Sequence, residues 1–390
     1  MRRRAGRRGL AARITIAVVV GWVLLEIAAR LFLHFFATPD QFLAYATVRQ
    51  LETLPAEQRW VIPHRYLGYV LGPGYRNGAN RHNSLGLRGD EIAPVAAEGT
   101  YRIVCLGGST TYSTPVDDPA DAYPARLQET LHRAGYRNVE VVNAGVPGYG
   151  SLETMLFFEL EILDLEPDLI LVSHAANDVH ARLVWPAEAY RGDNSGWRGG
   201  WRVDTLPLLL EHSTALRMLW IRLGWLRSFR SMESVFGPSS ATSFTALFHA
   251  QVSDGSYPSG PFAEVPITRM LEVNRPVYFA RHLRNIVAVA RTHGVEVALV
   301  TFPYHPNWRG RAPIADPDYR AAIEDANRVT RQVAAAAGVH GFDLAAHIPA
   351  DEKLYTDGYH FTREGNQLRA RVLAGMIVDR GLLEGVESPR

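Results

Sequence analysis

Three residues in two distant stretches of the chain have the types that nucleophilic acyl transfer requires. Ser109 follows two glycines in the stretch LGGSTT, and Asp357 and His360 share the short segment DGYH near the C-terminus. A serine hydroxyl becomes a strong nucleophile when a histidine removes its proton, and a carboxylate must orient that histidine. We therefore predict a catalytic triad in which Ser109 attacks, His360 is the base and Asp357 orients the base.

The oxyanion that develops in such a reaction needs two or three fixed hydrogen-bond donors. The candidates are the backbone N–H of Ser109, the backbone N–H of Gly145 in the stretch NAGVPG, and the side-chain amide of Asn177 in HAAND. Glycine suits position 145 because a close approach of backbone to substrate leaves no room for a side chain. The glycines before Ser109 are expected to let the chain turn sharply off a strand.

Other polar residues near these motifs fit structural roles better than catalytic ones. Asp178 is expected to be a loop or capping residue, and His174 and His305 are expected to be structural histidines. A phosphate-binding loop needs a lysine after its glycines, and a dinucleotide fingerprint needs three spaced glycines; residues 107–118 have neither pattern. No His, Asp or Glu cluster has the spacing of metal ligands, so we expect no metal and no cofactor.

Short apolar segments alternate with amphipathic ones, and the first three motifs each follow an apolar segment. The pattern predicts strands at 101–106, 139–142, 168–173, 295–301 and 340–343. It predicts helices at 120–134, 152–163, 278–293, 319–337 and 363–380. Almost wholly apolar strands that alternate with helices indicate an α/β fold, a three-layer, doubly wound parallel sheet. Ser109, Gly145 and Asn177 should then meet at the carboxyl edge of the sheet.

The first 36 residues have the composition of a membrane segment. Six arginines and no acidic residue occupy 1–13, and 14–36 are mostly apolar, close to the ~20 residues that a span requires. We expect an uncleaved signal anchor, with a cleaved signal peptide and a soluble amphipathic helix as alternatives. In a single-pass protein the arginines would keep the N-terminus in the cytoplasm, and the catalytic domain would be periplasmic or extracellular.

A lead-in segment at 37–100 is expected to precede a domain at 101–385, which contains an insertion at 181–274. A strongly apolar helix is expected near 206–226. The insertion could be a helical subdomain with its own core, a lid or wall for the substrate, or a surface that contacts the membrane. It holds five of the eight tryptophans, namely Trp185, Trp197, Trp201, Trp220 and Trp225.

Charge and cysteine content exclude some classes of protein. The net charge of the 390 residues is +1. Without the six N-terminal arginines, the chain has 35 basic and 40 acidic residues. A mildly acidic body lacks the basic stripe of a nucleic-acid surface, so no nucleic acid is expected as a partner. Cys105 is the only cysteine, which excludes an intrachain disulfide, and it is expected to be a buried, inert thiol. No feature of the sequence indicates an oligomeric state.

The motifs in this order resemble those of the SGNH, or GDSL-like, hydrolase superfamily. The resemblance covers roughly 101–180 and 280–380, and it implies a flavodoxin-like sandwich with esterase or lipase activity. Some members are acyltransferases on carbohydrates. Gly108 stands where the family usually has aspartate, and Ala175 stands where it usually has glycine. The matching blocks are Gly-Gly-Ser109-Thr, Asn-Ala-Gly145, Ala-Ala-Asn177-Asp and Asp357-Gly-Tyr-His360.

Together these features predict a membrane-anchored serine esterase that hydrolyses an O-acyl ester outside the cytoplasm. The expected partners are the membrane and an acylated small molecule or glycan, preferably a small acyl group on a carbohydrate. The alternatives are an O-acyltransferase that uses the same triad on a glycan acceptor, and a non-catalytic envelope protein that keeps the fold. Acid should lower the activity, because His360 must be neutral to accept a proton.

Overall fold

The computed structural model describes residues 2–47, 50, 55–64, 66–193, 207–226 and 244–386. The chain forms two compact units. One consists of 1–54 and 200–235, and the other of 55–199 and 236–390. The second, larger unit contains every candidate site residue.

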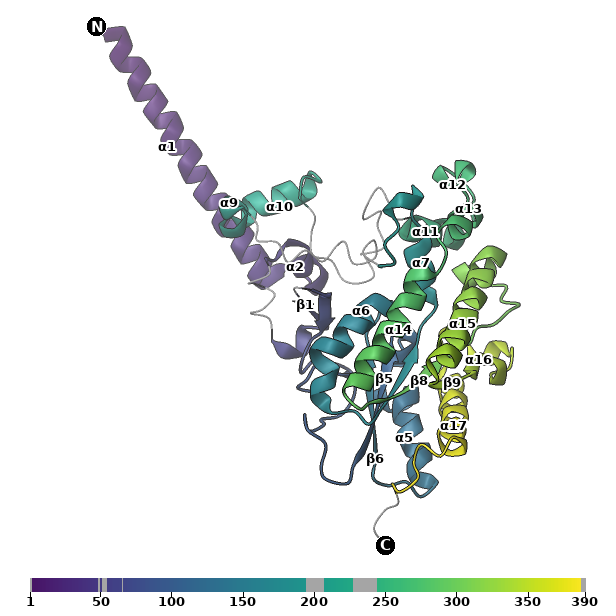
Figure 1. The fold of residues 1–390 in the computed structure, drawn as a ribbon. Coiled ribbons are helices and arrows are strands. Elements are labelled where there is room, and N and C mark those ends of the chain that lie inside the picture. Colours follow the sequence, from purple (N-terminus) through teal and green to yellow (C-terminus); the bar gives the residue numbers. More distant parts are fainter. Residues whose placement is uncertain are drawn as a thin grey trace. The chain divides into compact units, whose positions relative to one another are not determined.

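A five-stranded, wholly parallel sheet forms the centre of the larger unit (Figure 1). Its strand order is β6-β5-β7-β8-β9. The bounds are β5 Tyr101–Gly107, β6 Val139–Gly145, β7 Leu169–Ser173, β8 Glu296–Val300 and β9 His340–Phe342. The next strand in the chain after β5 pairs on one side of it, and the third strand pairs on the other. The end of β5 is therefore the switch point at which such sheets bind ligands.

Helices cover both faces of this sheet, which confirms the predicted three-layer fold (Figure 1). On one face α5 packs against α17, and on the other α14 packs against α6 and α15. Their bounds are α5 Tyr123–Arg133, α6 Ser151–Phe157, α14 Val277–Thr292, α15 Pro317–Ala337 and α17 Arg363–Asp379. Side chains of β5 alternate between the faces, and Ile103 and Cys105 join the core with α5 and α17. Burial raises the pKa of the Cys105 thiol to about 12, so this thiol is inert.

Most predicted strand and helix boundaries differ from the observed ones by one to three residues. The helix expected at 152–163 is α6 followed by a π-helical turn at Phe158–Ile162. Strand β6 continues to Gly145 because its residues pair with β5 as far as Gly107. The extra pairing depends on the neighbouring strand, which a local apolar pattern does not record.

Residues of the lead-in segment that belong to the larger unit form two small hairpins and a loop. The strands are β1 Val61–His64, β2 Gly68–Leu71, β3 Arg76–Asn77 and β4 Asn80–Arg81. Arg88 follows them and is buried, with 4% of its surface exposed. Its guanidinium donates hydrogen bonds to the backbone carbonyl oxygens of Tyr112, Ser113, Val116 and Asp117. Arg88 therefore stabilises residues 112–117, which follow the candidate nucleophile in the chain.

The smaller unit is helical and contains the N-terminal segment. Among the described residues one helical stretch, Ala12–Phe36, is long and apolar enough to cross a membrane, and an 18-residue window within it has a mean hydropathy of 2.2. It consists of most of α1 (Arg2–Leu31) and a π-helical turn at Phe32–Phe36. A membrane anchor and a signal sequence both fit this stretch.

The described part of the insertion is divided between the two units. The helix expected near 206–226 is two helices, α9 (Leu208–His212) and α10 (Thr214–Arg222), because Ser213 caps the start of α10. The Glu26 carboxylate of α1 also caps α10, accepting from Ser213 Oγ at 2.8 Å and from two backbone N–H groups. Residue 206, Trp197 and Trp201 lie outside the described residues. Helices α11 Thr245–Asp254, α12 Pro261–Glu264 and α13 Ile267–Val273 belong to the larger unit.

Candidate active site

Ser109, His360 and Asp357 lie in one hydrogen-bonded line. Oγ of Ser109 is 2.7 Å from Nε2 of His360, and Nδ1 of His360 is 2.7 Å from Oδ2 of Asp357. Because an ionised carboxylate can only accept, Nδ1 carries the hydrogen and Nε2 keeps its lone pair for the serine proton. The structure thus brings the three predicted triad residues together with the geometry of a nucleophile, a base and an orienting acid.

The segment that carries Asp357 and His360 is a tight turn. Oδ1 of Asp357 accepts hydrogen bonds from the backbone N–H groups of Tyr359 (3.2 Å) and His360 (2.9 Å). Gly358 has a φ of +96°, and a Cβ there would lie 2.4 Å from Cγ2 of Ile314, so glycine is required. The backbone N–H of His305 donates to the Gly358 carbonyl oxygen at 2.7 Å, a structural role for this residue.

The environment of Asp357 keeps it ionised. Burial pushes its pKa up, but the charge of His360 and the hydrogen bonds from His360 and the backbone outweigh burial. The net pKa of Asp357 is below its ordinary value. The carboxylate is therefore charged at neutral pH and can stabilise the imidazolium that forms when His360 takes the serine proton.

Ser109 begins the short helix α4 (Ser109–Tyr112) directly after β5. A Cβ on Gly107 would lie 2.2 Å from Oγ1 of Thr111, and a Cβ on Gly108 would lie 2.7 Å from Nδ2 of Asn177. The φ of Gly108 is −91°, which any residue can adopt. The structure gives these glycines a steric role at the turn from β5 into α4, because a side chain at either position would collide with Thr111 or Asn177.

The two donors expected beside Ser109 are arranged differently. Asn177, in α7 (Ala176–Arg182), donates through Nδ2 to the Tyr149 carbonyl oxygen at 2.7 Å, and its second N–H has no partner among the described residues. The backbone N–H of Gly145 donates to Oδ1 of Asn143 at 3.1 Å. Its role as an oxyanion donor stays a prediction.

The reason expected for glycine at position 145 differs from the one the structure shows. A Cβ on Gly145 would lie 2.2 Å from the backbone nitrogen of Tyr112. The group that lies close to Gly145 is therefore the backbone of α4, which is part of the protein. Glycine is needed there so that β6 can pack against the helix that starts with the nucleophile.

Three side chains that the sequence pattern did not single out lie behind Asn177, of which His180 and Tyr319 are buried and His249 is half-buried. Nδ1 of His180 is 3.3 Å from Oδ1 of Asn177. Nε2 of His180 is 2.8 Å from the Tyr319 hydroxyl of α15 and 2.9 Å from Nε2 of His249 of α11. The spacing of Asn177 and His180, three residues apart on one helix, is the only local signal for this group. Because His249 lies in the insertion, the insertion reaches the candidate site.

Asp178 and His174 have structural contacts, in agreement with the sequence. The Asp178 carboxylate accepts from the backbone N–H of Ser151 at 3.1 Å and from Ser151 Oγ at 2.5 Å, which caps α6. Burial raises the pKa of Asp178 to about 7. Nε2 of His174 is 2.8 Å from Oγ1 of Thr154, and burial lowers the pKa of His174 to about 3.

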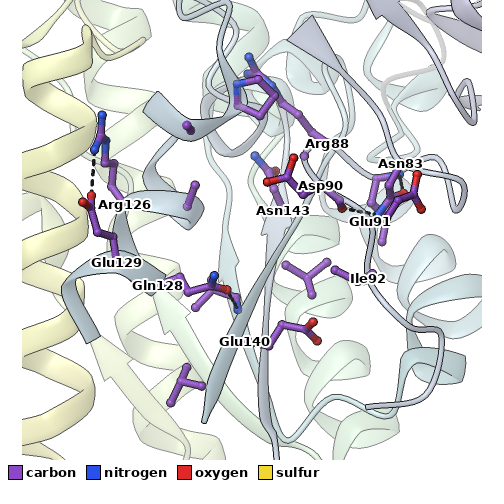
Figure 2. A pocket seen from close by; sticks show the side chains of 18 of the residues that line it. Asn83, Arg88, Asp90, Glu91, Ile92, Arg126, Gln128, Glu129, Glu140 and Asn143 are labelled. Atoms are coloured by element: carbon purple, nitrogen blue, oxygen red, sulfur yellow. Dashed lines mark hydrogen bonds and ion pairs between the residues drawn. The ribbon is translucent and has the colours of Figure 1, made fainter. Parts of the chain in front are cut away.

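A separate cavity of about 620 Å³ lies beside β6 (Figure 2). No member of the triad lines this cavity. Side chains of both charges line it, including Arg88, Asp90, Glu91, Arg126, Glu129 and Glu140. We therefore assign the candidate chemistry to the carboxyl edge of the sheet and not to this cavity.

A model of the GDSL-like lipase/acylhydrolase family matches residues 105–368. A search of curated proteins found no match. Among solved structures, a lipase/acylhydrolase from Enterococcus faecalis is 18% identical, with 72% of this chain and 97% of that chain covered and a TM-score of 0.41. A catalytic mutant of an acetylxylan esterase from Geobacillus stearothermophilus is 13% identical, with 72% and 96% covered and a TM-score of 0.41. The match to the family model covers more than half of the chain.

Proposed function

Because the chain belongs to the GDSL-like lipase/acylhydrolase family, we propose that it is a serine esterase whose triad is Ser109, His360 and Asp357. The observation that carries this proposal is the hydrogen-bonded line from Ser109 Oγ through His360 to the Asp357 carboxylate. A serine without a catalytic role would not need an ionised carboxylate beside Nδ1 of the histidine that it contacts.

The geometry supports a two-step acyl transfer. His360 Nε2 takes the Ser109 proton while Oγ attacks the ester carbonyl carbon, and the resulting imidazolium then protonates the leaving alcohol. Water next attacks the acyl-serine by the same route, which releases the acid and restores the serine. The oxyanion would accept hydrogen bonds from the backbone N–H of Ser109 and from the amide of Asn177. Within the described residues, the Ser109 N–H and one of the two Asn177 N–H groups have no acceptor.

We place the substrate and the catalytic unit outside the cytoplasm. Support for this comes from the apolar stretch Ala12–Phe36 and the arginines that precede it. A small acyl group on an envelope or extracellular carbohydrate is the substrate class that fits this location. Carbonate extraction of membranes and N-terminal sequencing of the mature protein distinguish an anchor from a cleaved signal, because only an anchored chain stays in the pellet with its first residues intact.

The direct test compares the full chain, purified in detergent, with its Ser109→Ala variant on p-nitrophenyl acetate. We expect kcat to fall by about 10⁴-fold or more, because the nucleophile is lost. Ser84→Ala is the matched control, since Ser84 is an exposed serine outside the triad, and it should keep the full rate. Equal rates for wild type and Ser109→Ala would refute the assignment of the nucleophile.

A fluorophosphonate probe separates an activated serine from a retained but inactive fold. We expect labelling at Ser109 that His360→Ala abolishes. Transfer to a glycan hydroxyl is a second candidate, because His249 of the insertion reaches the site and a wall there could hold an acceptor. Products formed with and without an acetylated donor and a glycan acceptor decide between the two, and release of free acid under every condition would exclude transfer.

A further inference from the structure

The side-chain amide of Asn177 can help the reaction in only one orientation. With Nδ2 beside the Ser109 site, the amide offers an N–H to the oxyanion. Rotated by half a turn, it would offer the carbonyl oxygen, whose negative end repels the same charge. A donor of this kind works only when its orientation is fixed before the reaction. The groups that contact the two ends of this amide therefore matter for catalysis.

Both ends of the Asn177 amide have partners that agree on one orientation. The Tyr149 carbonyl oxygen can only accept, and it lies 2.7 Å from Nδ2. The ring of His180 lies at the other end, with Nδ1 3.3 Å from Oδ1. Since Oδ1 can only accept, Nδ1 of His180 must carry its hydrogen, and Nε2 of the neutral ring is then an acceptor.

The far side of the His180 ring supplies donors for the one lone pair that Nε2 has in this tautomer. The Tyr319 hydroxyl lies 2.8 Å from Nε2, and Nε2 of His249 lies 2.9 Å from it. Both can donate a hydrogen. The backbone of His180 is also held, because Thr245 Oγ1 of α11 donates to its carbonyl oxygen at 2.8 Å. The contacts of His180 thus join α7 to α11 of the insertion and to α15.

Burial keeps the ring of His180 in the neutral form. Only 2% of the surface of His180 is exposed. Burial lowers its pKa well below the ordinary value, and the positive forms of His249 and His360 would oppose its charge further. Burial likewise lowers the pKa of His249 to about 4. At neutral pH both rings are uncharged, which is the state in which His180 donates through Nδ1 and accepts at Nε2.

We propose that His180 is a positioning residue that fixes the oxyanion-binding orientation of the Asn177 amide, with His249 of the insertion and Tyr319 holding its ring. The hydrogen bond of His180 toward the site goes to the Asn177 amide, so His180 acts through Asn177 and is not itself a catalytic residue. The inference rests on the proposed esterase function, and it gives the insertion a definite part in the site.

Three variants of the full chain at position 180 separate positioning from simple packing. The amide of an asparagine reaches about as far as Nδ1, so His180→Asn can still donate to Asn177. The amide of a glutamine reaches about as far as Nε2, so His180→Gln keeps the polar group but not that donor, and His180→Leu removes both. We expect kcat on p-nitrophenyl acetate to fall by about 10- to 100-fold in His180→Gln and His180→Leu with KM unchanged. His180→Asn should keep most of the rate.

A double-mutant cycle tests whether the effect passes through Asn177. In the Asn177→Ala background, His180→Gln should cause no further loss of kcat, because the amide that it positions is gone. Losses that multiply, or a KM that rises while kcat stays constant, would overturn the proposal. So would equal rates for His180→Asn and His180→Gln, since that pair differs in the proposed donor.

Crystal structures of the wild type, His180→Asn and His180→Gln keep this inference separate from the proposed function. We expect the Asn177 amide to turn away from Ser109 in His180→Gln and to stay in place in His180→Asn. An unmoved amide in His180→Gln would refute the positioning role even if the enzyme is active. If the wild type hydrolyses no ester, the esterase proposal fails, whereas the orientation of Asn177 still decides the role of His180.

Discussion

At position 108 the missing side chain leaves room for the Asn177 amide. Asn177 Nδ2 occupies space that any Cβ on residue 108 would need, at a distance of 2.7 Å, and the Tyr149 carbonyl oxygen lies 3.0 Å from the same point. The aspartate that this family usually has before its serine would not fit here without a shift of α7. Glycine at 108 and the amide at 177 therefore depend on each other.

We expect Gly108→Ala to lower kcat by about 100-fold, because the new methyl group displaces the Asn177 amide from the oxyanion. Gly375→Ala is the control, since a Cβ there meets nothing within 4 Å and the position lies in the helix α17. That control should keep the full rate and gain about 0.5–1 kcal/mol of stability from helix propensity. Ester hydrolysis by the two purified variants decides the point, and equal kcat values would contradict it.

At the scale of elements, the candidate nucleophile Ser109 precedes a loop that the lead-in segment stabilises. The residues after α4 have no sheet partner, and Ser113 has a φ of +65°, which is uncommon for a non-glycine residue. Arg88 of the lead-in segment stabilises this loop through four backbone carbonyl oxygens and lies over the Tyr112 ring at 4.2 Å. The lead-in segment therefore supports the candidate nucleophile Ser109.

We expect Arg88→Leu to lower the free energy of unfolding by about 3 kcal/mol, because several buried carbonyl oxygens lose their donor. The esterase rate should fall at the same time, since Ser109 lies at the start of the loosened segment. Arg76→Leu replaces an exposed arginine of the same lead-in segment and should change neither quantity. Urea denaturation and ester hydrolysis measure the two effects, and a stable, fully active Arg88→Leu would disprove the support.

At the scale of the whole molecule, buried histidines couple folding to pH. Burial lowers the pKa of His82 to about 4, that of His174 to about 3 and that of His249 to about 4. Unfolded histidines bind protons near pH 6.5, so between that pH and about 4 the unfolded chain takes up protons that the folded chain does not. Stability therefore falls as pH falls through this window. Asp178, whose pKa is raised to about 7, acts in the opposite direction below pH 7.

We expect these three histidines and His180, whose pKa burial also lowers, to outweigh Asp178, so that the free energy of unfolding drops by about 5 kcal/mol from pH 7 to pH 5. Urea denaturation of the full chain in detergent at the two pH values measures the difference. In His82→Gln the drop should be smaller by about 2 kcal/mol, because one of the titrating groups is absent. A protein as stable at pH 5 as at pH 7 would show that these rings are not held neutral by burial.

Residue types and local patterns by themselves predicted the candidate triad, the parallel sheet and the apolar N-terminal helix, and the structure confirms the sheet and the helix. Acyl transfer accepts few side chains, so a serine after glycines and an Asp-x-x-His segment are specific even when 251 positions separate Ser109 from His360. Burial on both faces makes parallel strands almost wholly apolar, and that pattern is visible without a structure.

Only the tertiary structure decided how these residues are supported. It shows that the Gly145 N–H donates to Asn143 and that a side chain at Gly107 or Gly108 would collide with its neighbours. It also shows that His249 of the insertion contacts His180. These facts depend on contacts between segments far apart in the chain. Local hydrophobic periodicity records which face of an element is buried, but it does not record what lies against that face.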